Sequence, residues 1–381
     1  MLKKICFVIL SRANYSSIKS VIFEFKKDRS LKSFIITGAS ANEDKFGNVS
    51  ELIEKDFKID YKINMPSRPE SLIGMPQTVG GGLIELPLVL DKIKPDLVLI
   101  TGDRAEMFIA ALTAAYMKIA VAHIQSGDLS GHIDGSVRHA ITKISHLHFA
   151  SCEDSKKRVL KLGEESWRVY NTGAPQLDDF NKPIKINFKD FNKKYKIKLE
   201  KKFVIIMQHP VLYDNVNSGH QIEQTLKAVE KFSFQKIIIY PNIDTGNNKI
   251  IKIIDKYKNQ NNFIIFKNLK RDHFIFLLKN AEILIGNSSC GILEAASFKL
   301  PVINIGNRQK GRLQSKNILN AGYSSKEIMK AIKIIYKSKK YKKDLRKCKN
   351  LYGDGKSSER IVRILKKIRF NKSLLDKTNS Y

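Results

Sequence analysis

Acids, histidines and arginines gather between apolar runs in residues 101–151, and their types suit proton transfer. Ionisable groups buried without partners destabilise a fold strongly, so such a cluster rarely serves packing alone. Asp103 and Asp134, with an imidazole close by, supply an acid and a base for moving a proton. Asp134 alternatively caps the helix that we expect to begin beside it. The polar members of the segment are Asp103, Arg104, His123, Gln125, Asp128, His132, Asp134, Arg138 and His139.

Two other places carry residue types that bind anions. Arg12 and Ser16 follow the first apolar run at the expected start of a helix, where anions are favoured. An N-cap turn with a surface arginine explains these two residues equally well. In IGNSSCGILEAA, Ser288 and Ser289 lie between a strand and a helix and can form a nest for phosphate. Glu294, one turn later, can accept both hydroxyls of a ribose or simply solvate the helix.

Three further polar residues follow apolar runs of the second half. His209 comes after FVIIMQ, Asn242 after KIIIYP and Arg308 after PVINIGN. A histidine at a strand end contacts a ligand more often than it serves structure alone, and Arg308 and Arg312 are candidate counter-charges for a diphosphate. No Walker lysine and no GxGxxG after the first strand are found, which excludes a P-loop and disfavours a dinucleotide site.

Strand-like runs alternate with helix-length amphipathic segments along both halves of the chain. Continuous apolar runs such as LVLIT and AVAHI indicate strands buried on both faces, as in a parallel sheet covered by helices. The rhythm restarts after a lysine-rich stretch near residues 176–200, and we expect a helix over residues 291–298. The sequence therefore predicts an α/β fold with two doubly wound Rossmann-like domains, residues 1–178 and 179–355, facing a central cleft. A C-terminal helix and tail, residues 356–381, should pack back on the first domain.

Composition sets further bounds on this chain of 381 residues, of which 43% are hydrophobic and 28% charged. The formal net charge of +31 comes from lysines spread over the whole chain, with no recognition module, so we expect no nucleic-acid partner. Runs of about eighteen apolar residues are absent, as is a signal-peptide pattern, so we expect a cytoplasmic protein without a membrane partner. The four cysteines are scattered without a CxxC pair, which argues against a zinc site or a disulfide framework.

Over residues 3–370 the chain resembles the hydrolysing UDP-N-acetylglucosamine 2-epimerases, the enzymes that open sialic acid synthesis. The resemblance is carried by SRANYSSIK, KPDLVLITGDR, SGHIDGSVRHAITK, QHPV, PNIDTG, IGNSSCGILE, PVINIGNRQKGR and YGDG, in this order. It implies the glycosyltransferase-B architecture, with the sugar and catalytic residues in the first domain and UDP bound mainly by the second. It also implies anti elimination of UDP to a 2-acetamidoglucal, followed by addition of water to give N-acetylmannosamine. That chemistry needs no metal and no redox cofactor.

The resemblance also assigns roles to individual residues. The family's acidic trio falls on Asp103, Gln125 and Asp134, where the sialic acid enzymes commonly have Glu at the second position. A glutamine amide cannot take a proton at neutral pH, and Asp128 is then a candidate substitute. Gly135 also replaces a more usual second acid. The positions implied for the nucleotide or its diphosphate are Arg12, Ser16, Arg104, His209, Asn242, Ser288, Ser289, Glu294 and Arg308.

These departures leave two substrates open. We prefer UDP-N-acetylglucosamine because it is the commoner activity, and the alternative is UDP-2,4-diacetamido-2,4,6-trideoxyglucose, on the route to legionaminic acid. The rival functions are a non-hydrolysing epimerase, a glycosyltransferase of the same fold, and a nucleotide-sugar sensor without turnover. By resemblance we also expect a homodimer or homotetramer.

Overall fold

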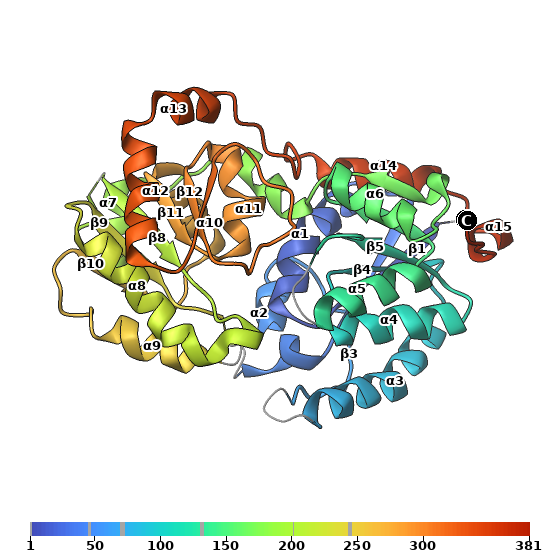
Figure 1. Cartoon of the computed structure of the whole chain (residues 1–381). Coiled ribbons are helices and arrows are strands. Elements are labelled where there is room, and N and C mark those ends of the chain that lie inside the picture. The colour runs from blue at the N-terminus through green and yellow to red at the C-terminus, as the bar shows by residue number, and fades with distance from the viewer. Residues whose placement is uncertain (1, 45–46, 69–72, 130–132, 201, 243–245) are drawn as a thin grey trace. The chain divides into compact units, whose positions relative to one another are not determined.

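The computed structural model describes residues 2–44, 47–68, 73–129, 133–200, 202–242 and 246–381, and omits the side chains of residues 133–134, 212–213 and 215. The chain divides into two compact units (Figure 1). Unit 1 comprises residues 1–181 and 352–381, and unit 2 comprises residues 182–351. In the part of the chain so described, no helix is long and apolar enough to cross a membrane.

Unit 1 is built on a parallel sheet with the strand order β3-β2-β1-β4-β5-β6-β7. Its strands are β1 (Lys3–Ile9), β2 (Leu31–Thr37), β3 (Tyr61–Lys62), β4 (Leu97–Thr101), β5 (Ala120–Ile124), β6 (Leu147–Ala150) and β7 (Val169–Asn171). Its α-helices are α1 (Arg12–Lys26), α2 (Val49–Glu54), α3 (Gly74–Ile93), α4 (Ala105–Tyr116), α5 (Ile133–Ile144), α6 (Glu153–Lys161), α14 (Ser357–Lys367) and α15 (Lys372–Leu375). Short 3-10 turns span Ala39–Asn42, Ser166–Arg168 and Pro175–Asn181.

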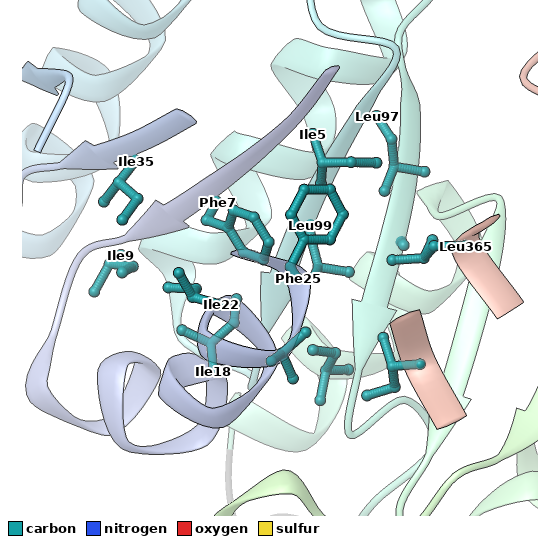
Figure 2. Close-up of a cluster of buried hydrophobic side chains, with 14 of the residues drawn as sticks. Ile5, Phe7, Ile9, Ile18, Ile22, Phe25, Ile35, Leu97, Leu99 and Leu365 are labelled. Carbon is teal, nitrogen blue, oxygen red and sulfur yellow. The ribbon is translucent and has the colours of Figure 1, made fainter. Parts of the chain in front are cut away.

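Helices cover both faces of this sheet because β1 is apolar on both sides. Successive strand residues point to opposite faces, so Phe7 joins one core cluster and Val8 the other. Figure 2 shows the first cluster, in which Ile22 and Phe25 of α1 and Leu365 of α14 pack around β1 and β4. Helix α14, which follows unit 2 in the chain, is therefore part of the core of unit 1.

Unit 2 repeats this plan with a parallel sheet in the order β10-β9-β8-β11-β12-β13. Its strands are β8 (Phe203–Met207), β9 (Gln235–Ile239), β10 (Phe263–Phe266), β11 (Ile283–Gly286), β12 (Val302–Ile305) and β13 (Ile318–Ala321). Its α-helices are α7 (Phe188–Tyr195), α8 (Ser218–Glu230), α9 (Asn247–Asp255), α10 (Arg271–Asn280), α11 (Ser289–Leu293), α12 (Ser325–Lys337) and α13 (Lys339–Arg346). Short 3-10 turns span Leu212–Asn217 and Ala295–Phe298.

The predicted α/β fold with two parallel, doubly wound sheets is confirmed. In each sheet the chain order reverses next to the first strand of the unit, between β1 and β4 in unit 1 and between β8 and β11 in unit 2. Loops that follow strands on either side of such a point diverge and leave room for a ligand. The predicted site residues follow β1, β4 and β5 in unit 1, and β8, β9, β11 and β12 in unit 2.

Candidate active site

Asp103 and Arg138 form an ion pair beyond the end of β4 in unit 1. Gly102 turns the chain there with φ 92°, a conformation that glycine adopts without strain. The Arg138 guanidinium, in the second turn of α5, donates to Asp103 Oδ2 at 2.5 Å. The Arg138 side chain is 5% exposed and that of Asp103 23%. The guanidinium therefore stabilises negative charge on a carboxylate that solvent or a ligand can still reach.

Gln125 lies beside this pair. It follows β5 in the left-handed region, with φ 62°. Its backbone amide donates to the carbonyl of Phe149 at 2.9 Å, and its own carbonyl accepts from Arg138 at 2.7 Å. Its side-chain amide donates to Gln176 at 3.3 Å. Through Arg138 the structure brings together Asp103 and Gln125, two of the four residues expected to be catalytic.

Asp128 is held by its surroundings. The residue is 8% exposed, and its Oδ1 accepts from the hydroxyls of Ser151 and of Ser155, the latter at 2.6 Å. The preceding Gly127 has φ 72°, and a Cβ there would lie 2.3 Å from the carbonyl oxygen of Ser155. These contacts anchor the loop after β5 to β6 and α6. The geometry thus explains Asp128 as a structural residue, and its predicted role as the substitute base stays a prediction.

Asp134 and His132 fall where the structure gives no side chains. His132 lies outside the described residues, and so does the side chain of Asp134, although its backbone belongs to the first turn of α5. The prediction that Asp134 takes part in proton transfer therefore stays a prediction. Arg138, one turn further along α5, is described and faces Asp103.

The buried side chain of His123 supports the turn that precedes Asp103. It is fully buried, and its Nε2 lies 2.8 Å from the carbonyl oxygen of Gly102, to which it must donate because a carbonyl cannot. Burial, and then the charge of Arg138, lower its pKa to about 3. The imidazole is therefore neutral at pH 7 and fixes the turn that precedes Asp103.

The three anion-binding candidates of unit 1 differ in their surroundings. Ser11 caps α1, and Arg12 is exposed in the first turn of that helix, where anions are favoured. The Ser16 hydroxyl donates back to the carbonyl of Arg12 at 3.0 Å. Arg104 pairs with the buried Glu106 at 3.2 Å, with its own side chain 42% exposed. Arg12 is thus exposed at the start of α1, whereas the guanidinium of Arg104 is paired with Glu106.

Asn287 connects the predicted residues of unit 2. It is fully buried, its Oδ1 accepts from the backbone amide of His209 at 2.7 Å, and its Nδ2 donates to the carbonyl of His209 at 2.9 Å. Its carbonyl accepts from Gln309 at 2.8 Å and from Arg308 at 3.3 Å. One asparagine at the end of β11 therefore fixes the loops that follow β8 and β12.

The ring of His209 is held in the tautomer that can donate a hydrogen bond from Nε2. Its Nδ1 accepts from the backbone amide of Asn242 at 3.1 Å, so the proton of the neutral ring is on Nε2. Burial, and then the positive charge of Arg308, lower its pKa to about 3. A neutral imidazole N–H beside a guanidinium suits a phosphate oxygen. The structure brings His209, Asn242 and Arg308 together, whereas Asp244 lies outside the described residues.

Ser288 and Ser289 open α11, which is shorter than expected. Ser288 is the N-cap residue and Ser289 the first helical one, and both are half-buried. The expectation of one helix over residues 291–298 was wrong, because α11 ends at Leu293 and a 3-10 turn follows. The side chain of Asn350 donates to the carbonyl of Leu293 at 2.8 Å and so takes an acceptor that helix continuation would use.

Glu294 lies where α11 ends. Its carboxylate is paired and is therefore not simply solvated. Its Oε2 accepts from Nη1 of Arg271 at 2.8 Å, and its side chain is 12% exposed. Arg271 was not predicted from sequence, nor was Gln176, the partner of Gln125. Both follow strands, Arg271 after β10 and Gln176 after β7, so the strand-end rule could have found them. Among the residues with described side chains, no group of three or more His, Cys, Asp or Glu could hold a metal ion.

Comparisons with known proteins place the chain in a family. Residues 24–366 match the sequence profile of the UDP-N-acetylglucosamine 2-epimerases. The chain is 34% identical to the UDP-N,N'-diacetylbacillosamine 2-epimerase (hydrolyzing) of Legionella pneumophila, with 100% of each chain covered. The chain belongs to the UDP-N-acetylglucosamine 2-epimerase family. It is thus a UDP-sugar 2-epimerase, as the sequence motifs predicted.

Two further similarities help to describe this 2-epimerase. It is 36% identical to the GDP/UDP-N,N'-diacetylbacillosamine 2-epimerase (hydrolyzing) of Campylobacter jejuni, over 84% of each chain. Its fold matches a crystal structure of UDP-GlcNAc 2-epimerase from Neisseria meningitidis bound to UDP-GlcNAc, with a TM-score of 0.81, covering 96% of this chain and 100% of that one. At 22% identity the latter match supports the glycosyltransferase-B-like fold alone.

Proposed function

We propose that this 2-epimerase is hydrolysing and that its substrate is UDP-N,N'-diacetylbacillosamine, which is UDP-2,4-diacetamido-2,4,6-trideoxyglucose. The observation that carries the choice of sugar is Gln125, whose backbone carbonyl contacts Arg138 and whose side-chain amide donates to Gln176, at a position where the sialic acid enzymes commonly have a carboxylate. An amide both donates and accepts hydrogen bonds, which suits a sugar whose 4-hydroxyl is replaced by an acetamido group. The names of the Legionella and Campylobacter relatives support the same sugar.

The proposed reaction has two balanced steps. A base takes the proton from C2 of the sugar, the C–H electrons form a C1=C2 double bond, and the C1–O bond breaks to release UDP. Water then adds its oxygen to C1. C2 takes a proton on the face opposite to the one from which its first proton was removed. The products are UDP and a free sugar inverted at C2. Since the C2 proton is weakly acidic, a positioned base and support for the departing UDP must share the barrier.

In unit 1 we assign the proton transfers to Asp103 and Asp134. The charge of Arg138 keeps Asp103 ready to accept a proton, and Arg138 holds it next to Gln125. Asp134 belongs to the first turn of the same helix as Arg138, which supports a place near Asp103. Gln125 then contacts the sugar without transferring a proton.

In unit 2 we assign UDP binding to the loops that Asn287 ties together. His209 and Arg308 suit the diphosphate because one offers a neutral N–H and the other a positive charge. Ser288 and Ser289 add hydroxyls at the start of α11. Glu294, oriented by Arg271, is the candidate acceptor for the ribose hydroxyls. Arg12, Ser16, Arg104 and Asn242 complete the proposed nucleotide contacts.

A UDP-release assay run on two nucleotide sugars tests the proposal. We expect UDP and a 2-epimeric free sugar from UDP-N,N'-diacetylbacillosamine, with one deuterium incorporated at C2 when the reaction is run in D2O. Faster turnover of UDP-N-acetylglucosamine would refute the choice of sugar but keep the hydrolysing reaction. Epimerisation with UDP still attached would indicate a non-hydrolysing enzyme. UDP release that requires an acceptor would indicate a glycosyltransferase, and binding without turnover would indicate a sensor.

UDP-N-acetylglucosamine is the second candidate substrate, because the profile that matches residues 24–366 is named for it. With that sugar the product is N-acetylmannosamine, a precursor of sialic acid. With the diacetamido sugar, the product leads toward legionaminic acid. Either way we propose a place in nonulosonate biosynthesis, in the cytoplasm.

We also propose that the enzyme is a homo-oligomer that pairs through α3. Ile84 and Leu88, one turn apart on this helix, are 70% and 59% exposed, and an added Cβ at Gly80 would meet nothing within 4 Å. One apolar helix face with a glycine on it suits close packing against the same face of a second copy. We expect Leu88→Glu to lower the mass measured by light scattering, with Val216→Glu in unit 2 as the control. A wild-type monomer would refute this.

A further inference from the structure

The C-terminal segment, residues 372–381, is fastened to unit 1 by a buried arginine. The Arg168 side chain is 1% exposed. It donates to the carbonyls of Leu374 at 2.7 Å, Asp376 at 3.0 Å and Ser373 at 3.2 Å. These are the carbonyls at the end of α15, which a helix leaves without partners. The segment is therefore docked in a defined position, and this position brings Lys377 into the interior.

Lys377 makes two kinds of contact there. Its Nζ donates to the carbonyls of Lys143 at 2.5 Å and of Ser145 at 2.8 Å, at the end of α5. It also lies 2.6 Å from Oε2 of Glu164, whose side chain is fully buried. A positive charge at a helix C-terminus stabilises that helix. Lys377 thus holds the far end of the helix that carries Arg138 and Asp134.

From Glu164 a chain of buried polar groups leads back to the active site. Oε2 of Glu164 lies 3.0 Å from Nε2 of His148, and Nδ1 of His148 lies 3.3 Å from the Ser126 hydroxyl. Ser126 lies 3.2 Å from the hydroxyl of Thr142, which lies 3.4 Å from Nδ1 of His123. These five side chains are fully buried. Nε2 of His123, as described above, donates to the carbonyl before Asp103.

The protons in this chain have a defined direction. The Glu164 carboxylate can only accept, so His148 donates to it through Nε2 and must accept the Ser126 proton at Nδ1. Thr142 has one hydroxyl proton, and its possible acceptors are the carbonyl of Arg138 at 3.0 Å, the Ser126 oxygen at 3.2 Å and Nδ1 of His123 at 3.4 Å. Burial alone would raise the pKa of Glu164, but the hydrogen bond from His148 and the two lysines, Lys143 and Lys377, lower it to about 2. The charge of Glu164 therefore sets the direction of the hydrogen bonds as far as Ser126.

We propose that Lys377 is a positioning residue for catalysis, which acts on Asp103 through α5 and on Gln125 through the buried hydrogen bonds from Glu164 to Ser126. Arg138 of α5 pairs with Asp103, and Ser126 directly follows Gln125, so the two routes end at these two residues. The inference rests on the proposed hydrolysing activity, whose failure is seen separately as absence of turnover by the wild type.

The titration of Lys377 allows this role to be tested through the pH dependence of kcat. Burial lowers its pKa to about 8, although Glu164 raises it and Lys143 and Arg168 lower it further. The other titratable groups that face this cluster are His146 and His148, whose pKa values burial lowers. As the pH rises through about 8, Lys377 loses its proton and its pairing with Glu164. We expect wild-type kcat to fall over that range.

Three variants separate this role from simple anchoring. We expect Lys377→Ala to lower kcat about tenfold, with KM and UDP affinity nearly unchanged. Lys377→Arg should restore kcat and remove the fall near pH 8, since arginine stays charged. Lys372→Ala, an exposed lysine of the same segment, is the matched control and should behave like wild type. A Lys377→Ala enzyme with a lower melting temperature but wild-type kcat would overturn the inference, as would the same pH profile in wild type and Lys377→Arg.

A double-mutant cycle tests the buried chain itself. Lys377 is linked to Ser126 through Glu164 and His148. If they act through one chain, Lys377→Ala combined with Ser126→Ala should lower kcat by less than the product of the two single effects. Effects that simply multiply would show that the two residues act independently and would overturn the proposed path.

Discussion

Replacement of Arg138 by methionine tests the arrangement on which the proposed chemistry depends. Methionine keeps an unbranched apolar side chain but lacks the guanidinium and its hydrogen bonds to Asp103 and to the carbonyl of Gln125. Loss of one partner of a buried ion pair costs about 3–5 kcal/mol. Because the Asp103 side chain is 23% exposed, water compensates part of that cost, and we take about 3 kcal/mol.

Two measurements follow from this magnitude. If the transition state loses as much stabilisation as the folded protein does, kcat drops by about 100-fold, since about 1.4 kcal/mol corresponds to a factor of ten. The melting temperature should also fall by about 6–12 °C, at about 2–4 °C per kcal/mol for a unit of this size. UDP affinity should stay within about twofold, because Arg138 belongs to unit 1 and the proposed UDP contacts are mainly in unit 2.

The control is Arg360→Met, which breaks an exposed pair with Asp354 at 2.7 Å. Surface pairs contribute about 0–1 kcal/mol, so this variant should keep its activity and nearly its melting temperature. Asp103→Asn should also lower kcat strongly, and Asp103→Asn combined with Arg138→Met should be little worse than the worse single variant. An Arg138→Met enzyme with kcat within threefold of wild type, at about 0.7 kcal/mol, would refute the reasoning.

Three other predictions follow from single residues. Gln125→Glu should raise turnover of UDP-N-acetylglucosamine relative to the diacetamido sugar; an unchanged ratio would exclude position 125 as a determinant of the sugar. Glu294→Ala should weaken UDP binding by about tenfold, the worth of a charged hydrogen bond, as measured by calorimetry, whereas Lys326→Ala on the surface should not. Burial lowers the pKa of His123 to about 3 and of His146 to about 4, so unfolded chains bind more protons below pH 6.5. Stability should therefore fall from pH 6.5 to pH 5 by about 2 kcal/mol for each, as followed by denaturant titration; a flat curve would contradict these shifts.

The sequence predicted those features of the fold and site that depend on residues close together in the chain. Apolar runs such as LVLIT predicted buried parallel strands, and polar residues after those runs predicted site loops, because the carboxyl ends of parallel strands share one sheet edge. His209, Asn242 and Arg308 were identified in this way. His209 and Arg308 both contact Asn287, and Asn242 contacts His209.

Contacts between distant parts of the chain could not be predicted this way. The pairing of Arg271 with Glu294, and that of Gln125 with Gln176, depend on how loops fold back across the sheet edge. At the helix break near Glu294, the carbonyl of Leu293 accepts from Asn350, a contact between distant residues that no local pattern encodes. In the sequence, Lys377 cannot be distinguished from the other lysines of this lysine-rich chain. Its burial beside Glu164 in the structure distinguishes it.

The left-handed backbone at Gln125 has a consequence for the history of the enzyme. Hydrogen bonds of the main chain, to Phe149 and from Arg138, hold this residue in place whatever its side chain. Glutamine and glutamate have nearly the same shape, and their codons differ in a single base. A point mutation can therefore exchange the chemistry presented to the sugar without rebuilding the loop. If position 125 sets the choice of sugar as proposed, one base change is enough to alter that choice while the fold stays the same.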